Sequence, residues 1–137
     1  MTSLSQKNLD VLLADDDADD RLLFEEAMFE VNRDAKLSTV RNGSQLMGFL
    51  EESTPPVPSM IFLDLNMPIM SGLESAQRIR QLEKEHGLPQ VPIIAVTAKA
   101  MQGDREQCIA AGANDYISKP VDVDKLLSLI KVWLHSA

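Results

Sequence analysis

Carboxylates follow two apolar runs of the sequence, at the point where each run ends. Asp15 and Asp16 come directly after residues 11–14, and Asp64 directly follows residues 60–63. Four apolar residues in a row are typical of a strand that is covered on both faces. In an open α/β sheet, ligands bind beyond the carboxyl ends of the strands. Carboxylates crowded at that edge need a cation, and a hard divalent ion such as Mg2+, which prefers oxygen ligands, is the natural candidate.

Two other polar residues stand at the ends of later predicted strands. Thr97 directly follows the apolar run over residues 92–96. Lys119 directly follows the strand predicted at residues 115–118 and precedes Pro120. If all these strands are parallel and adjacent, their ends place several carboxylates, a hydroxyl and one ammonium in a single pocket. Such a pocket again favours a bound cation, because its carboxylates outnumber its one ammonium.

The bulk composition excludes several classes of protein. The 137 residues suffice for one domain, and 45% of them are hydrophobic, which is normal for a globular protein. The net charge of −8, with no basic patch, argues against direct nucleic-acid binding. No apolar run is as long as a membrane span, and the polar N-terminus lacks a signal-peptide core. The single cysteine, Cys108, cannot form an internal disulfide, so a cytoplasmic protein is expected, with Cys108 as a small buried hydrophobe.

Short apolar runs alternate with amphipathic segments along the whole chain. The pattern predicts strands at residues 10–14, 36–40, 60–63, 92–96 and 115–118. It predicts helices at residues 18–31, 44–51, 73–85, 101–111 and about 122–135, with Asp16 or Asp17 capping the first and Asp122 the last. Strict alternation favours a parallel sheet with helices on both faces. We therefore expect a flavodoxin-like, doubly wound (βα)5 fold of strand order 2-1-3-4-5, with residues 1–8 as a flexible segment and 9–137 as one domain.

The first and last helices carry more apolar residues than one stripe needs. In the first, Leu23, Ala27 and Val31 are expected on the core stripe, with Phe24 and Met28 beside it. The expected core stripe of the last helix is Val123, Leu126, Leu127, Ile130 and Leu134. Leu129, Val132 and Trp133 are then left over. They form either a surface for self-association or a partner, or a patch in which Trp133 folds back over the end of the sheet.

Five separated signatures resemble the receiver domain of two-component response regulators. They are Asp15-Asp16, the run from Asp64 through Asn66 and Pro68 with Gly72, Thr97-Ala98, Tyr116, and Lys119-Pro120. The resemblance covers residues 10 to about 135. The run over residues 95–101 together with Lys119-Pro120 looks especially like the receivers attached to hybrid histidine kinases.

This resemblance implies a role for each signature residue. Asp64 is then the phosphoacceptor. Asp16 and Asp64 bind Mg2+ through their carboxylates, and Asn66 binds it through its backbone carbonyl. Asp15 acts through a metal-bound water. Thr97 and Lys119 hold the phosphoryl oxygens. Tyr116 is the switch aromatic that alters the face formed by the fourth helix, fifth strand and fifth helix, and a cis Lys119–Pro120 bond is a family feature.

The resemblance also implies partners. The phosphoryl donor is a histidine kinase or a histidine phosphotransfer protein. If the leftover apolar residues of the last helix form a self-association surface that phosphorylation strengthens, we also expect a phosphorylation-dependent homodimer. Asn66 and Lys99, two residues beyond the phosphoacceptor and the threonine, influence how long the phosphoryl group lasts in the family.

Other interpretations of the same residues predict different structures. Asp15, Asp17, Asp19 and Glu26 have the spacing of a calcium EF-hand loop, although Asp20 occupies the position that needs glycine. The acidic run is also compatible with a solvated helix N-terminus.

Two further alternatives concern function. A phosphatase of the aspartyl-phosphate kind needs a second catalytic aspartate two residues after the nucleophile, where this chain has Asn66. A degenerate receiver that only binds partners is expected to lack the aspartate, threonine or lysine, and all three are present. We therefore expect a signalling receiver and not an enzyme with substrate turnover, apart from its own phosphorylation and slow autodephosphorylation.

Overall fold

The computed structural model describes residues 9–52, 58–65, 67, 71–98 and 102–135. Within these ranges, the side chains of residues 52, 102–105, 134 and 135 are not described. The expected flexible segment at residues 1–8 lies outside the described residues, as do Asn66, Pro68 and Lys99. None of the described helices is both long enough and apolar enough to span a membrane.

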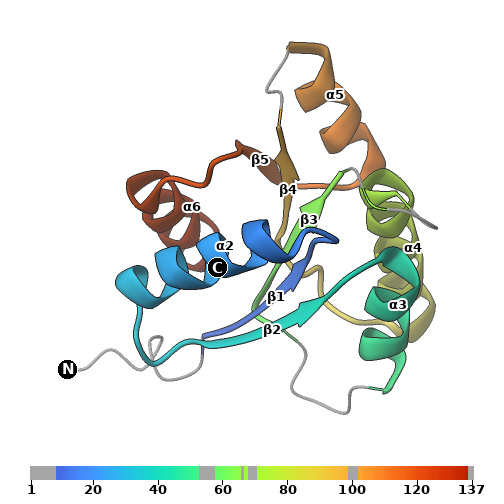
Figure 1. Ribbon diagram of the computed structural model, residues 1–137. Helices are drawn as coiled ribbons and strands as arrows, with labels where there is room; N and C mark the ends of the chain where they lie inside the picture. Colours follow the sequence, from blue (N-terminus) through green and yellow to red (C-terminus); the bar gives the residue numbers. More distant parts are fainter. Residues whose placement is uncertain (1–8, 53–57, 66, 68–70, 99–101, 136–137) are drawn as a thin grey trace.

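The described chain alternates strictly between strand and helix (Figure 1). The strands are β1 (Asp10–Ala14), β2 (Lys36–Val40), β3 (Met60–Asp64), β4 (Ile93–Thr97) and β5 (Asp115–Ser118). The helices are α2 (Ala18–Val31), α3 (Gly43–Glu52), α4 (Gly72–His86), α5 (Gln102–Ala111) and α6 (Val123–His135). All neighbouring strands are parallel, and the sheet order is β2-β1-β3-β4-β5. The flavodoxin-like fold expected from the sequence is therefore confirmed.

The limits of β4 differ by one residue from those expected. Pro92 lies outside the strand, because a proline has no N–H to give to a ladder. Thr97 lies inside it, because it pairs with Ser118 and its carbonyl accepts the N–H of Lys119 at 2.8 Å. The polar residue that was expected to follow the strand is thus its last member.

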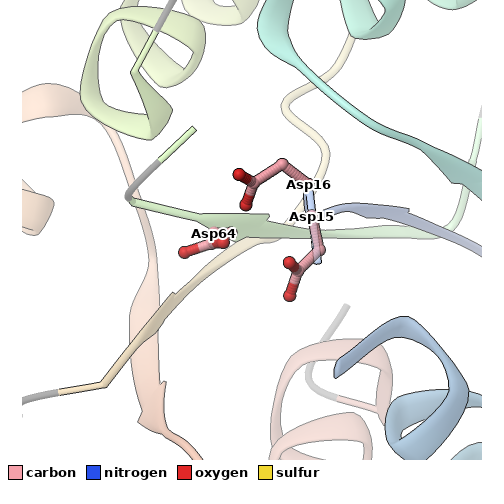
Figure 2. A group of neighbouring side chains, drawn as sticks. All are labelled: Asp15, Asp16 and Asp64. Carbon is pink, nitrogen blue, oxygen red and sulfur yellow. The ribbon is translucent and has the colours of Figure 1, made fainter. Parts of the chain in front are cut away.

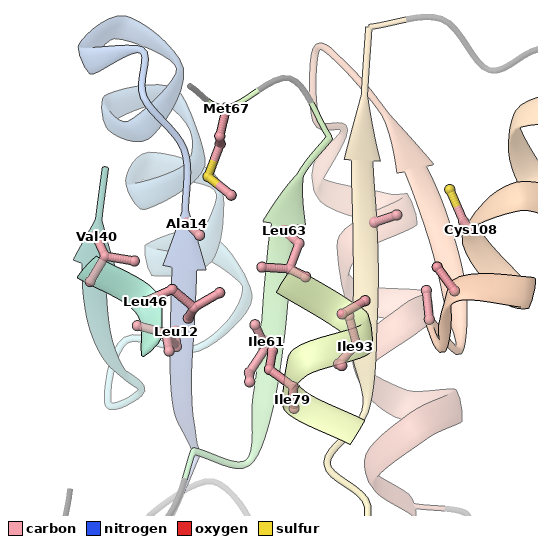
Figure 3. Close-up of a cluster of buried hydrophobic side chains, with 14 of the residues drawn as sticks. Leu12, Ala14, Val40, Leu46, Ile61, Leu63, Met67, Ile79, Ile93 and Cys108 are labelled. Atoms are coloured by element: carbon pink, nitrogen blue, oxygen red, sulfur yellow. The ribbon is translucent and has the colours of Figure 1, made fainter. Parts of the chain in front are cut away.

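Alternate residues of the strands serve two separate cores, because successive side chains of a strand point to opposite faces. In β3, Ile61 and Leu63 pack toward α3, α4 and α5, whereas Met60 and Phe62 pack toward α2 and α6. Figure 1 shows these two helical layers, and Figure 3 shows the first core in close-up, with Cys108 among its buried side chains. Burial on both faces explains why β3 reads as an unbroken apolar run.

The buried face of α2 is turned relative to the expected one. Phe24, Ala27 and Met28 are buried, but Leu23 is 53% exposed, so its place on the core stripe was wrong. The rings of Phe24 and Phe62 lie 4.9 Å apart in an edge-to-face arrangement. This contact with β3 directs Phe24 inward, and the neighbouring Leu23 is then directed outward.

The expected assignment of α6 residues to a core stripe and a leftover surface was also wrong. Leu126 and Ile130 are buried, but Leu129 and Trp133 pack against the same core, and of the leftover residues Val132 is the one exposed, at 54%. The indole Nε1 of Trp133 donates to Asp115 Oδ2 at 3.2 Å, at the start of β5. Trp133 therefore folds back against the domain, as the second interpretation of this helix predicted. Leu127 is half-buried, and the side chain of Leu134 is outside the described part.

Candidate functional site

The carboxyl ends of three central strands bring buried polar side chains together. Asp15 directly follows β1, Asp64 ends β3 and Thr97 ends β4, and these residues are 2%, 3% and 5% exposed. Backbone pairing continues up to this edge, since Asp15 N–H donates to Val40 O and Leu65 N–H donates to Val96 O, both at 3.0 Å. The sheet itself therefore holds these residues in place.

Three carboxylates form a compact cluster at this edge (Figure 2). One oxygen from each of Asp15, Asp16 and Asp64 lies within 4.8 Å of the others. Asp15 and Asp64 are buried, whereas Asp16 is exposed. Oxygen ligands at such spacing, open to solvent on one side, suit a hard divalent cation that keeps some of its waters.

The turn after β1 fixes the direction of the Asp15 carboxylate. Asp15 Oδ1 accepts the N–H of Asp17 at 2.9 Å, and Asp17 in turn caps α2 by accepting the N–H of Asp20 at 3.0 Å. Arg21 Nη1 donates to the Asp15 carbonyl at 2.9 Å. Asp17 is the N-cap and α2 runs without interruption from Ala18, so these residues form a capped helix start and not a calcium loop, and the EF-hand interpretation is wrong.

Lys119 supplies the positive charge of the site. Its Nζ lies 2.7 Å from Asp20 Oδ2, 3.1 Å from Asp15 Oδ2 and 3.3 Å from Asp64 Oδ2. Burial by itself lowers the pKa of Lys119, but the hydrogen bonds to Asp20 and Asp15 and the charge of Asp64 outweigh it and raise the pKa above its usual value. The lysine therefore stays charged at every physiological pH.

The surroundings of Asp15 favour its neutral form, whereas those of Lys119 favour the charged form. Burial raises the pKa of Asp15 from 3.8 to about 6, and the charge of Asp64 adds to this effect. The N–H of Asp17 and the ammonium of Lys119 oppose the increase in pKa without cancelling it. The site thus holds more negative charge than its own lysine compensates, as expected of a site built for a cation.

Gly72, at the start of α4, lies against the end of β3. Its N–H donates to Leu65 O at 3.3 Å, and a Cβ on Gly72 would stand 2.5 Å from the Asp64 carbonyl and 2.9 Å from Leu65 Cα. Only glycine allows this approach, so the glycine that the sequence pairs with the Asp64 signature positions the backbone of Asp64.

The predicted site residues do not all lie together. Asp15, Asp16, Asp64 and Lys119 do, with Thr97 on the adjoining strand end. Tyr116 is on β5, half-buried against the core that faces α5, and the Lys119–Pro120 bond is cis. Asn66 lies outside the described residues.

One member of the site was missed by sequence reasoning. Asp20 contacts Lys119 from the first turn of α2, although the sequence suggested for it only a misfit in a calcium loop. Its position one turn after the acidic pair was the available signal, since a helix side chain there faces the strand ends.

Comparisons with known proteins agree with this geometry. The family model described as response regulator receiver domain matches residues 11–131. Hybrid signal transduction histidine kinase I of Dictyostelium discoideum is 35% identical over 126 residues, which cover 90% of this chain and 7% of that kinase. The chain thus corresponds to a small part of that relative.

Two solved structures have the same fold. One is the receiver domain of sensor histidine kinase PA1611 from Pseudomonas aeruginosa PAO1, with a magnesium ion coordinated in its active site cleft. It is 30% identical, with a TM-score of 0.78 over 93% of this chain and 98% of that one. The other is the receiver domain of Ssk1 from Saccharomyces cerevisiae, in complex with the histidine phosphotransfer protein Ypd1. It is 29% identical, with a TM-score of 0.80 over 91% of this chain and 88% of that one.

The strand order, the acidic cluster with its lysine, and a family match over nearly the whole chain lead to one conclusion. The chain belongs to the response regulator receiver domains, and it is a receiver domain of two-component signalling.

Proposed function

We propose that Asp64 is the phosphoacceptor and that it takes its phosphoryl group from a histidine kinase or a histidine phosphotransfer protein. The observation that carries this proposal is the position of Asp64, whose carboxylate belongs to the acidic cluster and lies 3.3 Å from the ammonium of Lys119. The complex of the Ssk1 receiver with Ypd1 and the likeness to hybrid kinases support this class of donor.

The donor set fits Mg2+. Asp16 and Asp64 would bind it through carboxylates and Asp15 through a metal-bound water, with the Asn66 carbonyl as a further ligand that stays a prediction. When bound, the ion supplies positive charge that reduces the repulsion between two anions. A magnesium ion coordinated in the related PA1611 receiver supports this assignment.

In the transfer step an Asp64 carboxylate oxygen attacks phosphorus, a P–O bond forms, and the P–N bond of the phosphohistidine breaks. The imidazole leaves with the electron pair of that bond and takes up a proton. Lys119 and the hydroxyl of Thr97 donate to the phosphoryl oxygens, where charge must be stabilised. The acyl phosphate on Asp64 is then lost slowly to water, so that the chain acts as a transient signal without turning over a substrate.

The output is a shift between two packings of the same fold. Thr97 moves toward the new oxygens, and Tyr116 turns into the space that it leaves. The surface of α5, β5 and α6 then changes, and its exposed Ile109 and Val132 support self-association in the phosphorylated state. Sedimentation with and without beryllofluoride, a phosphoryl mimic, tests this homodimer, and a monomer in both conditions at high concentration contradicts it.

The phosphorylation site is tested by intact mass after incubation with acetyl phosphate or a phosphorylated histidine kinase. We expect one added phosphoryl group with Mg2+, and none in Asp64→Ala or with excess chelator. The matched control is Asp34→Ala, an exposed aspartate in the turn before β2. Labelling that persists in Asp64→Ala would show that another residue accepts the group.

A further inference from the structure

Lys119 has a closer partner than the phosphoacceptor. Its Nζ lies 2.7 Å from Asp20 Oδ2, against 3.3 Å from Asp64 Oδ2. An ammonium has three N–H donors, and among the described residues three carboxylates lie within 3.3 Å of the Lys119 ammonium, those of Asp15, Asp20 and Asp64. The donors of Lys119 are therefore all engaged, so a phosphoryl oxygen needs one of them to be released.

Asp20 differs from the other two partners in how easily it is released. The side chains of Asp15 and Asp64 are 3% and 4% exposed and belong to the carboxylate cluster, whereas that of Asp20 is 34% exposed and lies outside the cluster. A carboxylate at the surface regains water when its partner leaves, and this hydration offsets most of the lost attraction. Asp20 is thus the partner that Lys119 loses at the lowest cost in free energy.

We propose that Asp20 is a positioning residue that holds Lys119 in the unphosphorylated protein and competes with a phosphoryl group on Asp64 for its ammonium. This inference rests on the proposed function of Asp64. A contact that is made in one state and lost in the other shifts the equilibrium toward the first state. Asp20 therefore weakens the hold of the domain on a phosphoryl group.

The test is the affinity of the domain for beryllofluoride at saturating Mg2+, measured from the 19F resonance of the bound mimic. Asp20→Asn keeps the shape of the side chain and removes its charge. Asp19→Asn is the matched control, because Asp19 is the preceding residue of the same helical turn, is exposed, and brings the same change in net charge. The Mg2+ affinity of each variant is measured separately, so that saturation is assured.

We expect Asp20→Asn to bind beryllofluoride about threefold more tightly than wild type, the size of effect that a partly exposed ion pair produces. Asp19→Asn should bind like wild type. Equal affinities in the Asp20 and Asp19 variants, or weaker binding in Asp20→Asn, would overturn the competition while leaving the role of Asp64 intact. A wild-type domain that binds no beryllofluoride would overturn both the inference and the proposed function.

The unfolding midpoint of the three proteins without ligand gives a second measurement. If Asp20 competes for Lys119, Asp20→Asn must gain affinity for beryllofluoride even if it lowers the unfolding midpoint. The reason is that the lost contact between Asp20 and Lys119 stabilises only the unliganded state. A change in midpoint alone, with no change in affinity, would assign Asp20 a purely structural role and overturn the proposal.

Discussion

At the scale of single residues, the site combines one lysine with more carboxylates than it can neutralise. Asp15 is buried beside Asp64, and its pKa is raised to about 6, chiefly by burial. A carboxyl group with a raised pKa binds its proton more readily in the folded state than in the unfolded chain. The metal-free protein therefore loses stability as the pH rises from about 4 to about 6, and the cost stays in full at higher pH.

This cost predicts the effect of neutralising Asp15. Asp15→Asn should raise the unfolding free energy of the metal-free protein at pH 7 by about 1 kcal/mol, because relief from burying the charge exceeds the lost attraction to Lys119. Below about pH 4 the difference should vanish or reverse. Urea unfolding in chelator across this pH range measures both, and a variant less stable than wild type at pH 7 would show that the contact with Lys119 dominates.

At the scale of elements, the site depends on how closely a helix approaches a strand. The first residue of α4 is Gly72, and it lies against the backbone at the end of β3. The same helix begins with a capping box in which Ser71 and Glu74 bond each other's backbone N–H groups. The cap determines where the helix starts, and the missing side chain determines how near it comes to Asp64.

Adding a methyl group at this contact should disturb both fold and site. Gly72→Ala is expected to cost about 1–3 kcal/mol, the range for overpacking against backbone, and to weaken Mg2+ binding by displacing Asp64. Gly48→Ala in α3 is the matched control, because a Cβ there meets nothing within 4 Å and should stabilise the helix by up to about 1 kcal/mol. Denaturant unfolding and Mg2+ titration measure both effects, and equal behaviour of the two variants would mean that α4 shifts freely.

At the scale of the whole molecule, a hydrophobic core packs against each face of the sheet, and the functional site lies at the carboxyl ends of the strands. A partly buried network supports the first core, since Arg80 of α4 donates to Gly112 O, Glu83 Oε1 and Asn114 Oδ1 at 2.7–2.9 Å. Because both faces of the sheet are packed, the strands cannot easily move apart to relieve the repulsion within the acidic cluster. A cation that binds there should therefore stabilise the entire domain.

We expect Mg2+ at about 100 times its dissociation constant to add about 2.7 kcal/mol to the unfolding free energy and roughly 5–10 °C to Tm. NaCl at the same ionic strength should do much less, because it only screens the net charge of −8. Asp16→Asn should lose most of the Mg2+ effect. Differential scanning calorimetry measures all three, and equal stabilisation by the two salts would argue against a specific site.

Much of this arrangement is determined by local sequence. Unbroken apolar runs predicted β1, β3 and β4. The alternation of strands and helices then predicted the sheet, because right-handed crossovers leave few topologies. The polar residue at each strand end predicted Asp15, Asp16, Asp64 and Lys119 as neighbours, since parallel strands place their carboxyl ends at one edge. These inferences need only the periodicity of the chain and the rules of parallel sheets.

Only the tertiary structure decided which side chains meet across the fold. Leu23 and Phe24 are equally apolar neighbours, and packing against Phe62 determined which is buried. Lys119 and Asp20 are 99 positions apart, so no local pattern could pair them. Trp133 and Asp115 are likewise distant in the sequence, and they form a hydrogen bond because α6 packs near β5. Helix rotation and side-chain pairing depend on contacts between distant segments, and these form only once the whole core is assembled.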